Sequence, residues 1–315
     1  MTSPILGPLP YRTLCVGDTI ALVAPAGPST AEDVDAARAL IERRGYRCRV
    51  FPGCLQVRDH LAGSDAQRRQ DLEAAFRDPD VRAIFCIRGG YGSARLLPHL
   101  HRGLLLLHPK ALIGYSDITA LHAWLNNQGM VGLHAPMIAS DLLHPDRAAD
   151  LDALFEVLTG GLRVGDTLDG GDAPGSAVHL AGRASGRLVG GNLSVLASLL
   201  ATPWQLRTDN SILFLEDIGE APYRVDRLLW QLRESGVLAG VRGFVLGSFS
   251  GAEDCTAVLA EALLPLNKPI VSGWPAGHGA PHRTLPLGAR VRLDTDLRQI
   301  MLLQNVLLPL DDIPL

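Results

Sequence analysis

A serine occupies the position where the sequence predicts that a strand ends and a helix begins. The apolar run at residues 111–114 precedes Ser116, and apolar residues then recur at helical spacing as far as Leu125. A strand-to-helix turn of this kind lifts a serine hydroxyl above the sheet edge and directs helix N–H groups toward the atom it attacks. Ser116 is therefore a candidate nucleophile. The simpler alternative, which this stretch alone favours, is that Ser116 caps the helix while Asp117 adds charge to its first turn.

A carboxylate stands in a comparable place, at the end of a second apolar run. Glu216 follows residues 212–215, where an unpaired charge would be costly to bury. A buried acid in this position could orient an imidazole. The alternative is a structural role, in which Glu216 caps a helix or forms a salt bridge with Arg224 or Arg227.

A histidine could supply a general base. His278 lies in a loop rich in glycine and proline, after a strand predicted at residues 269–272, and a loop histidine beside glycines can reach a cleft. The alternatives are His282, His134 at the end of its own strand, or a surface role for His278. A serine, an acid and a histidine that each follow the carboxyl end of a strand could act as nucleophile, orienting acid and general base.

A glycine-rich segment follows another predicted strand. The nearly continuous apolar run Val81–Ile87 leads into Arg88-Gly-Gly-Tyr-Gly-Ser-Ala-Arg95. Its glycines would let backbone N–H groups face a ligand, as in an oxyanion loop, and an ordinary tight turn is an equal alternative. The spacing differs from GxGxxG, so we do not expect a dinucleotide site here.

Composition narrows the class of protein. The 315 residues include 29 Lys and Arg against 33 Asp and Glu, and the net charge of -4 gives no sign of a nucleic-acid groove or of binding to an anionic membrane. The five cysteines, at positions 15, 48, 54, 86 and 255, form neither CxxC nor a Cys/His cluster at zinc spacing. There is no signal-peptide pattern and no run of 18 apolar residues. We expect a cytoplasmic protein with reduced thiols, no metal and no cofactor.

The first part of the chain alternates strands and helices. Ser29 with Glu32, or Thr30 with Asp33, could cap the first helix, and Ser64 with Gln67 could cap the second. Strands are predicted at residues 19–24, 46–51, 81–87, 111–114 and 131–134, and helices at 34–41, 64–76, 116–129 and 148–158. This alternation predicts an α/β fold with a doubly wound, mostly parallel sheet of the Rossmann or flavodoxin type, whose site lies at the carboxyl ends of the strands.

The composition changes after residue 160. Residues 161–185 are rich in Gly, Asp, Ala and Pro, and we interpret them as a linker. We expect Gly186–Ser194 to be a glycine turn that opens a helix. Further strands are predicted at 212–216, 243–249, 269–272, 290–293 and 299–303, and further helices at 223–233 and 257–264. The predicted domains are therefore an N-terminal one, residues 1–160, and a second, smaller α/β domain, residues 186–315.

Several motifs occur in one order along nearly the whole chain: Arg88-Gly-Gly-Tyr-Gly-Ser-Ala-Arg95, Gly114-Tyr-Ser-Asp-Ile-Thr119, Gly186-x-Leu-x-Gly-Gly-Asn-Leu193, Leu215-Glu-Asp217 with Glu220-Ala-Pro-Tyr-Arg-Val-Asp226, and Gly277-His278 with Leu285-Pro-Leu-Gly288. Together they resemble the LD-carboxypeptidase family, also called muramoyltetrapeptide carboxypeptidases. The resemblance implies a triad of Ser116, Glu216 and His278. It also implies an oxyanion hole formed by backbone N–H groups near Gly90 and Asp117.

The order of serine, acid and histidine is shared with the α/β-hydrolases, but Gly114-Tyr-Ser-Asp-Ile118 lacks the second glycine of GxSxG. We therefore do not expect that fold. One departure from the family pattern is Leu133-His-Ala-Pro136, where His-Gly-Pro is expected. This departure bears on the shape of the cleft and leaves the nucleophile unchanged.

The resemblance also implies a substrate and a setting. Members of the family cleave the L,D bond before the terminal D-alanine of cytoplasmic murein tetrapeptides in peptidoglycan recycling, without a metal, and a homodimer is expected. Related immunity proteins cleave a peptide–nucleotide antibiotic, which is one alternative function, and non-catalytic binding of peptides or sugars is another. The sequence does not decide which arginine binds the substrate carboxylate; the candidates are Arg88, Arg224, Arg227 and Arg283.

Overall fold

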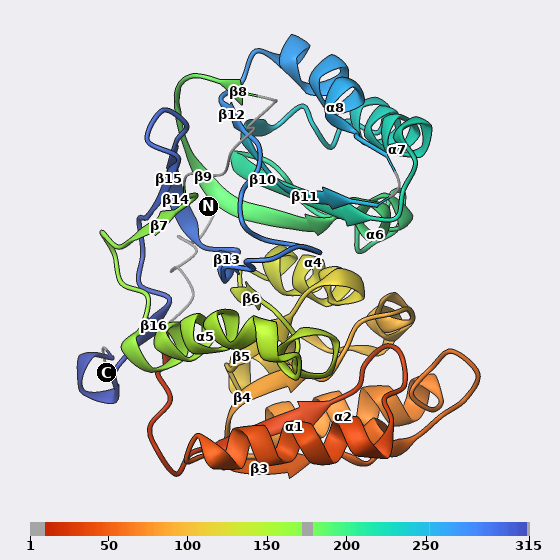
Figure 1. Cartoon of the computed structure of the whole chain (residues 1–315), viewed down its shortest axis with the longest axis vertical. Helices are drawn as coiled ribbons and strands as arrows, with labels where there is room; N and C mark the ends of the chain where they lie inside the picture. Colours follow the sequence, from red (N-terminus) through yellow and green to blue (C-terminus); the bar gives the residue numbers. More distant parts are fainter. Residues whose placement is uncertain (1–9, 172–178, 252, 314–315) are drawn as a thin grey trace.

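Two β-sheets, each with flanking helices, are stacked along the long axis of the molecule (Figure 1). The computed structural model describes residues 10–171, 179–251 and 253–313. The chain from red to yellow-green in Figure 1 builds the lower, first unit around a six-stranded sheet. The chain from green to blue builds the upper, second unit around an eight-stranded sheet.

The first sheet has the strand order β13-β6-β5-β4-β2-β3. Its strands are β2 (Thr19–Val23), β3 (Arg47–Val50), β4 (Val81–Cys86), β5 (Ala111–Gly114), β6 (Gly132–His134) and β13 (Leu285–Leu287). The first five are parallel to one another, and β13 runs antiparallel to β6. In chain order the parallel strands have the 2-1-3-4-5 arrangement of a flavodoxin-like sheet, which confirms the predicted doubly wound fold.

Local sequence signals set the ends of the helices in the first unit. Thr30 and Asp33 form a capping box at one helix, so of the two predicted pairs this is the one that caps it, and Ser64 with Gln67 forms the second capping box. The helices are α1 (Ala31–Arg43), α2 (Asp65–Arg77), α3 (Arg102–Leu107), α4 (Thr119–Asn127) and α5 (Ala148–Gly160). Short helical turns lie at Pro52–Leu55, Ser93–His99, Ser116–Ile118, Ile138–Leu142, Pro145–Arg147, Leu264–Leu266 and Leu310–Asp312.

The second sheet has the strand order β7-β15-β14-β9-β10-β11-β12-β8. Its parallel centre consists of β9 (Arg183–Asn192), β10 (Ser211–Ile218), β11 (Val241–Ser250) and β12 (Ile270–Val271). Antiparallel strands extend both edges: β7 (Thr167–Asp169), β8 (His179–Leu180), β14 (Arg290–Asp294) and β15 (Gln299–Leu302). Its helices are α6 (Leu193–Ser198), α7 (Pro222–Glu234) and α8 (Thr256–Leu263).

The expectation that Gly186–Ser194 forms a glycine turn is wrong. This stretch is the second half of strand β9, and helix α6 begins only at Leu193. Gly190 and Gly191 both have φ of 135°, in the region that favours glycine. A Cβ on Gly191 would lie 2.5 Å from the Thr119 hydroxyl oxygen, so these glycines permit close packing of β9 on its neighbours and do not form a turn.

Much of the predicted linker belongs to the second sheet. Strands β7 and β8 and the start of β9 all lie within residues 161–185 and pair with strands of that sheet. Residues 172–178 of the linker lie outside the described residues. The domain boundaries at 160 and 186 therefore stay a prediction, and the pairing makes this stretch an integral part of the second unit.

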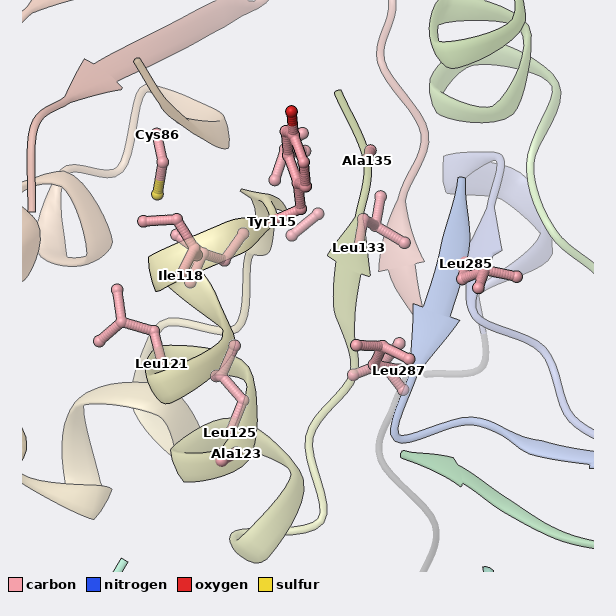
Figure 2. Packing of buried hydrophobic residues seen from close by; sticks show 14 of the residues in the cluster. Cys86, Tyr115, Ile118, Leu121, Ala123, Leu125, Leu133, Ala135, Leu285 and Leu287 are labelled. Atoms are coloured by element: carbon pink, nitrogen blue, oxygen red, sulfur yellow. The ribbon is translucent and has the colours of Figure 1, made fainter. Parts of the chain in front are cut away.

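The chain returns from the second unit to the first in strand β13. Figure 2 shows Leu287 of β13, Leu133 of β6 and Leu125 of α4 in one buried cluster. The two ends of the described chain also meet, because β1 (Tyr11–Arg12) pairs in parallel with β16 (Leu307–Leu308). The pairing of β13 with β6 anchors the end of the loop that precedes β13 on the first sheet. None of the helices described here is long and apolar enough to cross a bilayer.

We predict that Gly191→Ala destabilises the protein and lowers its activity. The substitution combines an unfavourable backbone conformation, worth about 1–3 kcal/mol, with a contact against Thr119 at the start of α4. Thermal unfolding and activity should be measured together. Gly103→Ala is the matched control, because Gly103 lies in α3 with open space around its Cβ position, and an unchanged melting temperature for Gly191→Ala would contradict the packing role.

Candidate active site

Ser116 is displayed on a sharp turn after strand β5. Its φ is 60°, in the left-handed region that residues with a side chain rarely occupy. Helix α4 begins at Thr119 without a side-chain cap, so the interpretation of Ser116 as a helix cap is not supported. Gly89 packs directly against the turn, since a Cβ there would lie 3.1 Å from Ser116 Oγ. The sequence thus places a strained serine at the carboxyl end of a central strand.

The Ser116 hydroxyl meets a histidine from the second unit. Ser116 Oγ lies 3.1 Å from His278 Nε2, and His278 Nδ1 lies 2.7 Å from Glu216 Oε2. The His278 backbone N–H also donates to Glu216 Oε2, at 3.1 Å. When Nδ1–H donates to the carboxylate, Nε2 is left to accept the serine proton. The structure therefore brings together the three residues that the sequence singled out, in an arrangement able to activate a nucleophile.

The carboxylate of Glu216 is fully buried near the end of β10. Its Oε1 atom has no hydrogen-bond partner among the described residues. Gly277, at φ 101°, lets the histidine loop approach, because a Cβ there would lie 2.7 Å from Glu216 Oε2. Glu216 has no ion pair with Arg224 or Arg227 in the described part of the chain, so the salt-bridge alternative is wrong.

Two opposing effects set the pKa of His278. Burial lowers it, but the hydrogen bond and negative charge of Glu216, helped by Asp141 and Asp217, outweigh burial and raise the pKa above its ordinary value. The carboxylates achieve this by stabilising the imidazolium. A histidine tuned in this way accepts a proton more readily than an ordinary imidazole.

The alternative histidines are buried and do not contact Ser116. His282 Nε2 lies 3.3 Å from His134 Nδ1. Burial lowers the pKa of His282 to about 3 and that of His134 well below its ordinary value. The Tyr115 ring lies 4.7 Å from the rings of both His278 and His282. His134 and His282 therefore belong to the neutral packing beneath the site.

A cavity of about 450 Å³ opens beside Ser116 and His278. This volume suits a small ligand. Gly90 lines the cavity, whereas the Asp117 carboxylate turns away and accepts a hydrogen bond from the Ser93 N–H at 2.8 Å. The lining residues are Arg88, Gly89, Gly90, Tyr115, Ser116, Met137, Ser140, Asp141, Arg147, Ile218, His278 and Gly279. A larger cavity of about 1100 Å³, beside α5 and β7, includes none of the Ser116, Glu216 and His278 side chains.

The four arginines left open by the sequence lie in different places. Arg88 lines the cavity. Arg224 forms an exposed ion pair with Glu220 at 3.6 Å, Arg227 lies over the Tyr223 ring, and Arg283 lines the larger, separate cavity.

Arg147 is a lining residue that sequence reasoning missed. Its Nη1 donates to the carbonyl oxygen of Gly279 at 2.8 Å, and its guanidinium pairs with Asp150 at 3.1 Å and with Asp141 at 3.6 Å. Asp150 also accepts the His282 N–H at 3.0 Å. These bonds hold the histidine loop on the first unit. No local motif identifies Arg147 as a site residue. Its partner Gly279 lies far away in the sequence, and its spacing to Asp141 and Asp150 matches no known motif.

The described residues include no group of three or more His, Cys, Asp or Glu placed to hold a metal ion. Ala135, where the sequence departs from the family pattern, is buried and donates its N–H to Gly114 O at 3.3 Å. It does not line the cavity described above.

We predict that Glu216→Gln lowers the pKa of His278. The raised pKa depends on the carboxylate, so the neutral amide leaves burial as the dominant effect. NMR titration of the imidazole signals, with the His278 signal assigned from His278→Gln, measures this directly. Glu156→Gln, an exposed change on α5, is the control. A His278 pKa that is equal in wild type and Glu216→Gln would show that Glu216 does not stabilise the imidazolium.

Several proteins of known sequence or structure are similar to this chain. A probable murein peptide carboxypeptidase of Bacillus subtilis is 33% identical over 297 residues, covering 90% of this chain and 91% of that protein. The murein tetrapeptide carboxypeptidase of Pseudomonas aeruginosa is 35% identical over 286 residues, covering 87% and 92%. The microcin C7 self-immunity protein MccF of Escherichia coli is 26% identical over 337 residues, covering 95% and 97%.

A solved structure and two family models also match this chain. The crystal structure of muramoyltetrapeptide carboxypeptidase from Oxalobacter formigenes has a TM-score of 0.80 and 33% identity, covering 92% of this chain and 99% of that one. The model of the LD-carboxypeptidase N-terminal domain matches residues 20–135, and that of the LD-carboxypeptidase C-terminal domain matches residues 185–293. The chain therefore belongs to the LD-carboxypeptidase family of peptidases.

Proposed function

We propose that the protein is a serine LD-carboxypeptidase that removes the terminal D-alanine from cytoplasmic murein tetrapeptides in peptidoglycan recycling. The observation that carries this proposal is the hydrogen-bonded chain from Ser116 through His278 to Glu216, which opens on a cavity of about 450 Å³. The names of the relatives from Pseudomonas aeruginosa and Oxalobacter formigenes support the substrate. The proposal includes a homodimer.

The proposed reaction begins with attack of Ser116 Oγ on the carbonyl carbon before the terminal residue. His278 Nε2 takes the serine proton and then gives it to the leaving amine, so that D-alanine departs and an acyl-serine ester remains. A water molecule, activated by the same imidazole, hydrolyses the ester and restores Ser116. Throughout, Glu216 stays ionised and keeps His278 in the required tautomer.

The developing oxyanion needs donors close to Ser116. We assign this role to backbone N–H groups of Gly90 and Asp117. Gly90 supports the assignment because it lines the cavity at φ 112°, a conformation suited to glycine. Asp117 supports the assignment because it directly follows the nucleophile in the chain. The Ser93 N–H donates to its carboxylate and so holds the side chain away from the cavity.

The site supports a peptide more than a peptide–nucleotide substrate. A nucleobase would need an aromatic surface to stack on. Among the residues that line the cavity, the aromatic side chains are Tyr115 and His278. The Tyr115 ring is buried and packs against the rings of His278 and His282, each 4.7 Å away.

We predict that the protein cuts a murein tetrapeptide ending in D-alanine and that its L-alanine counterpart and the pentapeptide ending in D-Ala-D-Ala are poor substrates. Inversion moves the scissile carbonyl relative to Ser116, and a displacement near 1 Å can cost on the order of 10²-fold in rate. Mass spectrometry should show the loss of one alanine, with kcat/KM compared across the three peptides. Ser116→Ala is the control for a contaminating peptidase.

Three outcomes would contradict the proposal. Equal rates for the D- and L-alanine termini would refute the stereochemical assignment. Turnover of an aminoacyl nucleotide without turnover of the tetrapeptide would instead favour an immunity hydrolase. Binding of the tetrapeptide without any turnover would indicate a non-catalytic binder.

A further inference from the structure

Arg88 lines the cavity and lies two residues after the end of strand β4. It is the first residue of the glycine loop, and its neighbour Gly89 packs against the nucleophile, where a Cβ would lie 3.1 Å from Ser116 Oγ. Arg88 itself lines the same cavity as Ser116 and His278. Arg88 is therefore the direct neighbour in the chain of the residue that packs against the serine.

The Arg88 guanidinium uses few of its hydrogen-bond donors within the protein. Its Nη1 donates to the carbonyl oxygen of Pro28 at 3.0 Å, which fixes the side chain against the neighbouring loop. Within the described residues, no carboxylate forms an ion pair with Arg88. A guanidinium carries five N–H donors, so several of them, with the full positive charge, are left on an exposed side chain.

Arg147, the other arginine that lines the cavity, already has its charge paired. Two carboxylates, those of Asp141 and Asp150, pair with it, and its Nη1 is used by Gly279 O. Its side chain is 10% exposed. Two negative charges around one guanidinium leave no net positive charge for a ligand on this wall of the cavity.

The cavity is therefore electrostatically asymmetric. Arg88, whose charge no carboxylate of the described residues pairs, lines one part of the cavity, and Asp141 lines another together with Arg147, 3.6 Å from it. An anionic group that enters is attracted toward Arg88 and not toward Arg147, whose charge the two carboxylates offset. A guanidinium binds a carboxylate through two parallel hydrogen bonds, which fixes direction as well as position.

From this asymmetry we infer that Arg88 binds the terminal carboxylate of the substrate and so selects a free chain end. The inference rests on the proposed carboxypeptidase function. In such a substrate the carboxylate lies one residue beyond the scissile carbonyl, a step of about 3.8 Å between Cα atoms. Arg88 directly precedes Gly89, which contacts the nucleophile. Because Arg88 and Ser116 line one cavity, a substrate whose scissile carbonyl lies at Ser116 has its terminal carboxylate in the same cavity as this guanidinium.

The test compares a tetrapeptide with a free terminal carboxylate and the same peptide as its C-terminal amide. Wild type should prefer the acid. Arg88→Ala should raise KM for the acid by roughly 10- to 100-fold, with a smaller change in kcat and little change for the amide, because the lost contact forms equally in ground and transition states. Arg88→Lys should restore part of the preference through its charge. Arg224→Ala, on the surface of α7, is the matched control and should behave as wild type.

Peptide binding to the inactive variant Ser116→Ala tests the role of Arg88 separately from the proposed peptidase activity. In Ser116→Ala, calorimetry should give tighter binding of the acid than of the amide, and Arg88→Ala added to Ser116→Ala should remove the difference. A wild type that cuts neither peptide, combined with that binding difference, would overturn the proposed activity and support the carboxylate site. An acid-to-amide ratio unchanged by Arg88→Ala, or an equal loss for both peptides, would overturn the assignment of Arg88.

Discussion

The burial of the Glu216 carboxylate is the constraint on which the arrangement of the two units depends. The side chain has no exposed surface, and its Oε2 atom accepts two hydrogen bonds, both from His278. A buried carboxylate without such a partner costs several kcal/mol. The loop that carries His278 must therefore dock on β10, and once docked its Nε2 faces Ser116 on the first unit. The same contact that stabilises the acid thus completes the proposed site.

Close approach between the units relies on glycines and one arginine. Between the units, Gly191 lets β9 reach Thr119 at the start of α4; within them, Gly277 lets the histidine loop reach Glu216 and Gly89 leaves room for Ser116. Arg147 then joins Gly279 of the histidine loop to the acidic residues of the first unit. A side chain at any of these glycines would push apart groups that must lie within hydrogen-bond distance.

The sequence predicts the parts of this fold that depend on local patterns. Capping boxes at Thr30 and Ser64 and the alternation of strands with helices identify the first sheet, and the ends of strands β5 and β10 identify Ser116 and Glu216. His278 could be singled out because its loop follows a strand, although local patterns alone left His282 and His134 open. The resemblance to a family added the triad and its substrate.

What the sequence could not predict depends on contacts between distant segments. The glycines at 190 and 191 look like a turn, and only their contacts with neighbouring elements show that they lie in a strand. Strand β13 joins the first sheet although it lies late in the chain. Arg147 finds Gly279 at a separation of 132 residues, which no spacing rule reveals. Arg88 and Arg224 look alike in the sequence, and their surroundings alone distinguish them.

Activation of Ser116 by a histidine from the other unit is tested most directly by labelling with a fluorophosphonate, which reacts with an activated serine and poorly with an ordinary hydroxyl. Intact-mass measurement and peptide mapping should find a single adduct, on Ser116. Labelling should be abolished in Ser116→Ala, slowed most in His278→Ala and slowed less in Glu216→Gln, where the geometry survives but the tautomer is no longer fixed. A wild-type protein that stays unlabelled, an adduct on another residue, or undiminished labelling in His278→Ala would contradict this role for Ser116 and His278.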